Sequence, residues 1–147
     1  MRREFSIVRV KSEVSKWAFP LSWDDVEVSP FAGPFNQLDQ LRLDVAVGCF
    51  PFARRTRDGR RAWRVSGQGS GVVEVWITSD GSLFIDGETT LNLLYALFSH
   101  ISETQRSLVL EDRITGVVHH EASLLKLMRR EEAAMVPYDL PGAEVAA

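Results

Sequence analysis

The chain has 147 residues and a formal net charge of −3, with 45% hydrophobic and 25% charged residues. This composition is that of a single folded domain, which excludes extensive disorder and a second full domain. The absence of a global basic charge makes nucleic acid or an anionic membrane surface an unexpected partner. The uncharged segment at residues 89–102 is too short to span a bilayer.

The compartment is predicted from two features of the sequence. Met1 to Glu4 are followed by polar and apolar residues in alternation, which is not the pattern of a signal peptide. The single cysteine, Cys49, excludes an internal disulfide and is predicted to be a small buried hydrophobic residue. We therefore expect a cytoplasmic protein.

The first half of the chain is predicted to contain two strands and one irregular segment. β-Branched and aromatic residues at 5–10 predict an opening strand. Prolines and aromatics at 17–35 fit no single period and predict a long loop. Strict alternation at 41–47 predicts a half-buried strand, with these residues on its apolar side: Leu41, Leu43, Val45 and Val47.

Asp58 and Gly59 predict a two-residue hairpin turn, because both turn positions favour positive φ. Counting outward from this turn places Arg54 opposite Trp63 and Arg55 opposite Ala62. Alternation then gives the hairpin a basic face and an apolar face. The basic face holds Arg55, Arg57, Arg60 and Arg64, and the apolar face holds Phe52, Trp63 and Val65.

The second half predicts an antiparallel meander and two helices. Asp80 and Gly81 repeat the hairpin signal between two apolar runs. Helical periodicity predicts one helix at about 88–103 and another at 121–135, with one broken strand or two strands between them.

The predicted fold is therefore α+β: a largely antiparallel sheet with both helices packed on one face. Residues 1–136 are predicted to form this one domain, and residues 137–147 a flexible C-terminal tail.

The main candidate site is the arginine-rich hairpin, because residues 50–66 carry six arginines and one acidic residue in an otherwise acidic chain. The six are Arg54, Arg55, Arg57, Arg60, Arg61 and Arg64. Arginine binds carboxylates well, so this segment suits an acidic patch on another protein or an anionic ligand. The alternative is a solvated turn whose charges prevent edge-to-edge pairing. Nucleic acid is disfavoured as a partner, because the acidic remainder of the protein would repel it.

The aromatic residues form a second candidate. Trp17 and Trp23 lie in the irregular loop and Trp63 in the hairpin, and they could line a ligand pocket or an interface. The alternative is that the loop covers one face of the sheet as part of the core.

The sequence contains histidines and a cysteine, but their spacing is not that of a catalytic site or a metal site. His119 and His120 are adjacent and would diverge on a strand or helix, so we expect no metal site and a surface or helix-start role. Cys49 has no base nearby in the sequence. We expect no cofactor, and an enzyme is disfavoured.

Two hypotheses of function follow. The first is a non-enzymatic protein-binding module, an inhibitor or adaptor, that binds an acidic patch; bacterial immunity proteins are one class with this profile. The second is a small-molecule or anion-binding domain with a pocket between the loop at 17–35 and the sheet, clamped by Arg54 or Arg64. Self-association as a homodimer stays open, because the apolar surface of the helix at 88–103 is wider than one contact requires.

Overall fold

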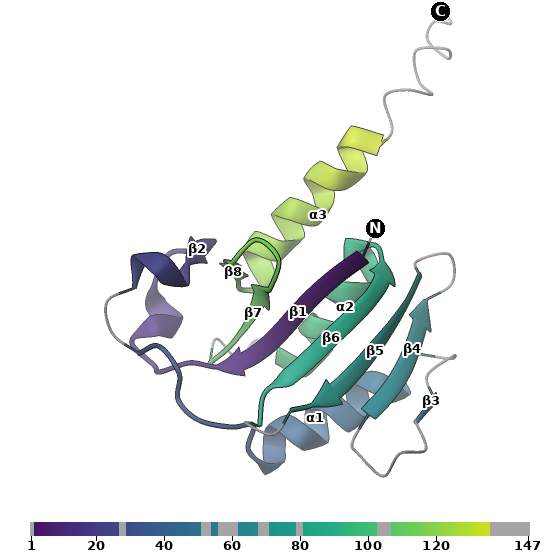
Figure 1. Cartoon of the computed structure of the whole chain (residues 1–147), viewed down its shortest axis with the longest axis horizontal. Coiled ribbons are helices and arrows are strands. Elements are labelled where there is room, and N and C mark those ends of the chain that lie inside the picture. The colour runs from purple at the N-terminus through teal and green to yellow at the C-terminus, as the bar shows by residue number, and fades with distance from the viewer. Residues whose placement is uncertain are drawn as a thin grey trace, which may run out of the picture.

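A computed structural model describes residues 2–26, 29–50, 54–55, 62–67, 71–78, 81–102 and 107–135. It contains one eight-stranded sheet in the order β2-β8-β7-β1-β6-β5-β4-β3, and all neighbouring strands are antiparallel (Figure 1). The strands are β1 (Arg2–Arg9), β2 (Leu21–Ser22), β3 (Arg54–Arg55), β4 (Ala62–Gly67), β5 (Gly71–Ile77), β6 (Leu83–Thr89), β7 (Leu108–Asp112) and β8 (Val117–His119).

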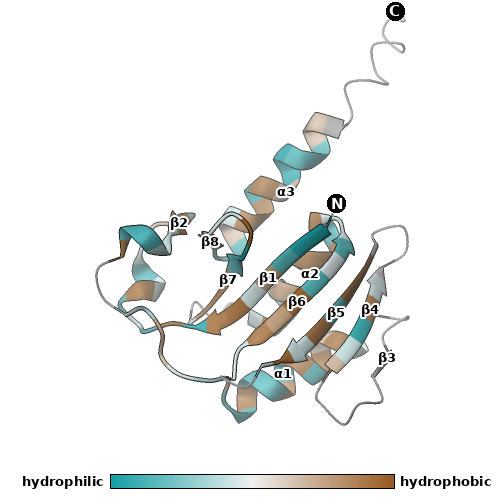
Figure 2. Ribbon diagram, in the orientation of Figure 1, coloured by the Kyte–Doolittle hydropathy of each residue, from teal (hydrophilic) through white to brown (hydrophobic). Residues whose placement is uncertain are grey.

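Helices α1 (Gln37–Gly48), α2 (Leu91–Ser102) and α3 (Glu121–Met135) lie on one side of this sheet, behind it in Figure 1. Their apolar residues and the inward residues of the strands form the main core. Phe98 and Leu97 of α2 are fully buried there, beside Ile7 of β1 and Ile85 of β6. Hydrophilic and hydrophobic residues alternate along the strands, as Figure 2 shows. The predicted α+β fold, with a largely antiparallel sheet and helices on one face, is confirmed.

Helix α1 replaces the strand predicted at 41–47, and that prediction was wrong. The side chain of Asn36 accepts a hydrogen bond from the backbone of Asp39, and the Asp39 carboxylate accepts one from the backbone of Asn36. This capping box starts a helix three residues after a proline. Leu43 and Val47 are buried at helical spacing, whereas Leu41 and Val45, expected to be inward, are about 60% exposed.

The other two helices were predicted correctly except for one end. Helix α3 spans the predicted range. Helix α2 begins at Leu91 instead of residue 88, because Asp86 to Thr89 continue strand β6 and pair with β1 and β5. Because of Leu93 and Leu97, the apolar surface of this helix is wider than one packing contact requires. Both residues are buried within the same chain, because α2 packs between α1 and α3.

The register of the arginine-rich hairpin differs from the predicted one by one residue. Arg54 lies opposite Arg64, and Arg55 lies opposite Trp63. All of β4 pairs with β5, whereas only two residues pair with β3, so β5 determines which face each residue of β4 occupies. Trp63 and Val65 face inward and Arg64 outward, as predicted. The prediction that Arg55 shares a face with Arg64 is wrong, because Arg54 is the residue opposite Arg64 and Arg55 is opposite Trp63. The turn at Asp58 and Gly59 lies outside the described residues.

The aromatic loop covers the sheet on the side opposite the helices. Val8 of β1, Val109 of β7 and Val118 of β8 point to that side and form a second core with Val10 and Val14. The partly buried residues packed against this second core are Trp17, Phe19, Leu21 and Trp23. The loop itself contains β2 and a short 3-10 helix, Trp23–Asp25, and a second 3-10 helix, Val14–Lys16, directly precedes it.

No helix among the described residues is long and apolar enough to cross a membrane. The predicted tail at 137–147 lies outside the part of the chain that the structure describes.

Candidate binding face

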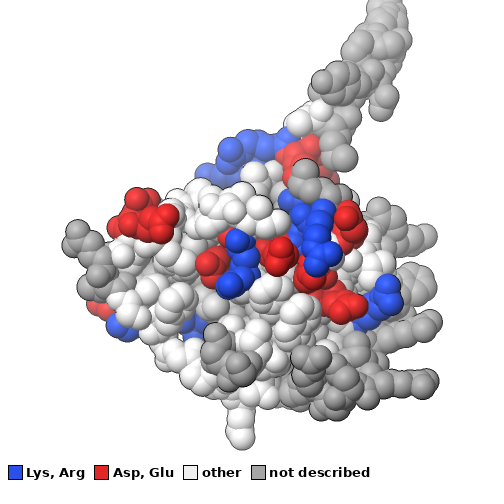
Figure 3. All heavy atoms as spheres, viewed as in Figure 1, with Lys and Arg blue, Asp and Glu red and all other residues white. Residues whose placement is uncertain are grey.

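The second core covers only one end of the sheet on the side away from the helices. The remaining surface on that side, formed by β1, β6, β5 and β4, is called the open face here. Its outward residues are Arg2, Glu4 and Ser6 of β1, Phe84, Asp86 and Glu88 of β6, Val72, Glu74 and Trp76 of β5, and Arg64 and Ser66 of β4. Figure 3 shows acidic and basic side chains gathered on this face.

Five charged residues form a continuous row across the open face. Arg64 lies opposite Glu74, Glu74 opposite Asp86, and Asp86 opposite Glu4. Arg113 follows, since its backbone N–H donates to the backbone carbonyl of Glu4 at 2.8 Å. Residues directly opposite on neighbouring strands bring their Cβ atoms to about 5 Å, so the three central carboxylates repel one another.

The charges of this row are only partly compensated. Arg2 forms an ion pair with Asp86 at 2.6 Å, and Arg113 a long one with Glu111 at 3.8 Å. Within the described residues, Glu4 and Glu74 have no ion-pair partner within 4 Å, and the buried Oδ1 atom of Asp86 has no hydrogen-bond partner. The open face therefore has a surplus of negative charge at its centre.

An aromatic pair lies beside the charged row. The rings of Trp76 and Phe84 stack with centroids 4.8 Å apart. The guanidinium of Arg113 lies 5.4 Å from the centre of the Phe84 ring, a cation–π distance that holds this side chain over the sheet. Stacking and the cation–π contact together fix the groups that a partner would meet.

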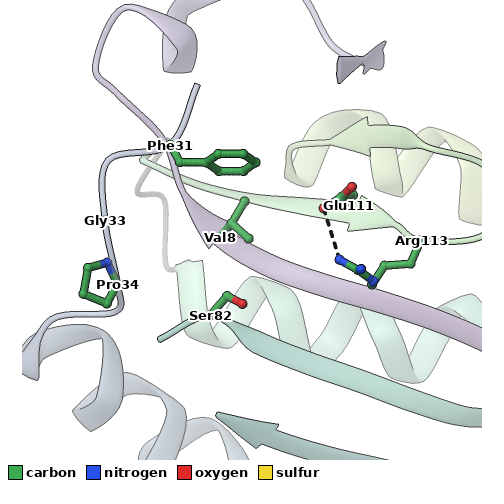
Figure 4. A pocket seen from close by; sticks show the side chains of 7 residues that line it. All are labelled: Val8, Phe31, Gly33, Pro34, Ser82, Glu111 and Arg113. Atoms are coloured by element: carbon green, nitrogen blue, oxygen red, sulfur yellow. Dashed lines mark ion pairs between the residues drawn. The ribbon is translucent and has the colours of Figure 1, made fainter. Parts of the chain in front are cut away.

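A pocket opens where the aromatic loop ends and the open face begins (Figure 4). Its volume is about 290 Å³, and its lining residues are Val8, Phe31, Gly33, Pro34, Ser82, Glu111 and Arg113. A pocket between this loop and the sheet was part of the second hypothesis, but the residues expected to line it do not line this one. Neither Trp17 nor Trp23 lines it, and its cationic residue is Arg113 instead of Arg54 or Arg64.

The predicted arginine cluster is described only in part. Arg64 is exposed on the open face, and Arg54 lies opposite it on the edge strand β3. Arg57, Arg60 and Arg61 lie outside the described residues. Trp63, a candidate for a pocket or interface, is 7% exposed in the main core.

The two histidines have different environments at the start of α3. His119 is 4% exposed, and its Nδ1 lies 3.0 Å from the Ser123 hydroxyl. Burial lowers the pKa of His119 below its usual value. The Nδ1 atom of His120 accepts a hydrogen bond from the backbone N–H of Ser123, so His120 has the predicted helix-start role. The same prediction was wrong for His119, which is buried as the last residue of β8. No group of three metal-ligating side chains is arranged around an ion position among the described residues.

Cys49 is exposed, which corrects the prediction that it is buried. It directly follows α1, and its thiol donates to the carbonyl of Val45 at 3.3 Å. Residues 41, 45 and 49 lie on the outer side of this helix, because helical periodicity replaces the predicted alternation.

Sequence reasoning missed Glu111 and Arg113 as site residues. Glu111 lies near the end of β7 and Arg113 directly follows this strand, and the charged residues at 111–113 after an apolar run were the only signal in the sequence. Their place beside Phe31 results from a long-range contact. No protein-family model matches the sequence, and no curated protein is significantly similar to it.

Proposed function

We propose that the protein is a non-enzymatic protein-binding module, an inhibitor or adaptor, that binds its partner on the open face and the adjoining arginine-rich edge. The observation that supports this most is the charged row, in which Glu4 and Glu74 have no ion-pair partner among the residues that the structure describes and Arg64 is exposed. Charged side chains without an ion-pair partner gain the most favourable interaction energy when a partner of complementary charge binds.

The charge pattern favours a partner surface with an acidic patch beside a basic one. Arg54 lies opposite Arg64, and like charges opposite each other across two strands are mildly destabilising. Carboxylates of a partner would relieve this repulsion. A lysine or arginine of the same partner would lie over Glu74. Immunity proteins of toxins, which occlude another protein in the cytoplasm, are an analogy for this mode of action.

A different protein, instead of a second copy of this chain, is the partner in this proposal. The apolar breadth of α2 was the reason to consider a homodimer, and Leu93 and Leu97 are buried within one chain. Nucleic acid is disfavoured because the centre of the open face is acidic.

The test is a capture experiment with two charge-matched variants. The first replaces Arg54, Arg57 and Arg60 with glutamate. The second replaces Lys126, Arg129 and Arg130 of α3 with glutamate, and these three side chains are exposed. Proteins retained from a lysate of the source cells are identified by mass spectrometry. The complex is then rebuilt from purified components, and its association rate is measured at low and high salt.

The hairpin variant is expected to associate at least about tenfold more slowly than the wild type, because electrostatic steering is lost, whereas the α3 variant keeps the wild-type rate. Circular dichroism checks that both variants fold. Equal association rates for the two variants, or no stoichiometric partner for the wild type, would refute the proposal.

A further inference from the structure

The pocket beside Phe31 has walls that are fixed on both sides. On the β1 side, the backbone N–H of Ala32 donates to the carbonyl of Arg9 at 3.0 Å, and Phe31 forms a β-bridge with Val10. On the β6 side, the N–H of Phe35 donates to the carbonyl of Gly81 at 2.8 Å. The pocket is therefore held open by backbone contacts and does not need a ligand to form.

Gly81 is required for this arrangement. Its φ is +85°, and a Cβ atom at this position would lie 2.1 Å from the Cβ of Pro34. Any other residue would push Pro34 away and change the wall of the pocket.

One end of the pocket is apolar and the other carries two opposite charges. Val8, Phe31 and Pro34 form the apolar walls, and Figure 4 shows Glu111 and Arg113 together at the opposite end. The distance of 3.8 Å between Arg113 Nη1 and Glu111 Oε1 is too long for a hydrogen bond. Arg113 Nη1 donates a hydrogen bond to Ser6 Oγ at 3.4 Å, so the other N–H groups of the guanidinium and the carboxylate of Glu111 keep hydrogen-bonding capacity for a ligand.

The pair of charges selects against singly charged ligands. A simple anion would bind Arg113 but would be repelled by Glu111 and by the neighbouring Glu4. A simple cation would bind Glu111 but would be repelled by Arg113. A zwitterion satisfies both groups. An α-amino acid carries its ammonium and its carboxylate on one carbon, so these two charges are close enough together to reach Glu111 and Arg113 at the same time.

We propose that this pocket binds a free α-amino acid with an apolar side chain. Arg113 donates hydrogen bonds to the ligand carboxylate, Glu111 accepts them from the ammonium, and the side chain lies between Phe31 and Val8. A volume of about 290 Å³ holds a ligand of this size but is small for a nucleotide. This inference does not depend on the protein-binding function.

The first experiment is calorimetric titration of the full chain with L-phenylalanine, phenylpropionate and phenethylamine. The last two ligands lack the ammonium and the carboxylate, respectively. L-Phenylalanine is expected to bind at millimolar concentration or below, and each analogue at least about tenfold more weakly, because one charged side chain is left without its partner.

Variants then test which side chain binds which charged group of the ligand. Arg113→Gln is expected to weaken the binding of L-phenylalanine at least about tenfold, while phenethylamine binds as tightly as before or more tightly. Glu111→Gln is expected to weaken the binding of L-phenylalanine by a similar factor without weakening the binding of phenylpropionate. Arg64→Gln is the matched control, an exposed arginine of the same face that does not line the pocket, and it keeps wild-type binding.

Three results would overturn the inference: no saturable binding of L-phenylalanine, equal affinity for phenylpropionate, or undiminished binding in both pocket variants. The proposal on protein binding would survive all three, because its variants lie in the hairpin and leave Glu111 and Arg113 intact.

Discussion

The side of the sheet away from the helices has two halves that differ in what covers them. At the β7–β8 end, Val109 and Val118 point outward and are fully buried under the aromatic loop. At the β5–β6 end, Glu74 and Asp86 occupy equivalent outward positions, and no described segment covers them. The same alternation thus gives a second core where the outward residues are valines and a charged surface where they are acidic.

This contrast indicates that the two halves have different roles. Burial of apolar side chains at about 25 cal/mol per Å² stabilises the covered half. Three carboxylates in a row at the uncovered half do not stabilise the isolated fold. Residues that cost stability in the free protein are candidates for function, and this is why the open face, instead of the tryptophan-rich half, carries the proposed interface.

Introducing a charge into the covered half is expected to have the largest effect. Val109→Asp places a carboxylate at a site with 0% exposure and should reduce the free energy of unfolding by about 4 kcal/mol or more. The milder Val109→Thr should lose about 1–3 kcal/mol. Urea denaturation measures both.

The matched change on the uncovered half is Glu74→Val, which should alter stability by less than about 0.5 kcal/mol. If Glu74→Val were as damaging as Val109→Thr, the two halves would not differ as described.

Acidification is expected to have the next largest effect, through His119 beneath α3. Burial lowers the pKa of His119 in the folded protein below the usual 6.5, so the unfolded chain takes up a proton first as the pH falls. Stability is retained above pH 6.5 and lost as the pH drops below it toward the folded-state pKa. The melting temperature should therefore fall between pH 7.5 and pH 5.

His119→Asn is the control for this effect, since an amide can still hydrogen-bond to Ser123 but does not titrate in this range. The part of the pH dependence that is due to His119 should disappear in this variant. An unchanged pH profile would assign the titration to another group.

The smallest effect is expected for the ion pair on the open face. Arg2 is 65% exposed and Asp86 23%, and partly exposed pairs contribute about 0–1 kcal/mol. Arg2→Gln should reduce stability by no more than this, and less at high salt. A loss comparable to that of Val109→Thr would mean that the open face stabilises the fold after all.

The fold was predictable where periodicity was long and uninterrupted. The helix at 121–135 had a clear apolar stripe and a proline after its end, and both ends were predicted correctly. The segment at 41–47 satisfied strand and helix patterns at once. Asn36 and Asp39 at capping-box spacing were the signal that favoured the helix.

The candidate site was predictable only in outline. Alternation correctly placed Arg64 outward and Trp63 inward. The pocket joins Phe31 to Arg113, and no local pattern in a single sequence indicates which distant segments meet. The hairpin register depended on the pairing of β4 with β5, which the residues of the turn do not indicate.

The position of β1 in the sheet has a consequence for how the chain folds during synthesis. β1 lies between β6 and β7, so its partners Ile85 and Leu110 leave the ribosome long after Phe5 and Ile7. The strand must remain unpaired until most of the protein has been made, and such non-local pairing slows folding. While it is unpaired, such a strand exposes apolar side chains that can aggregate.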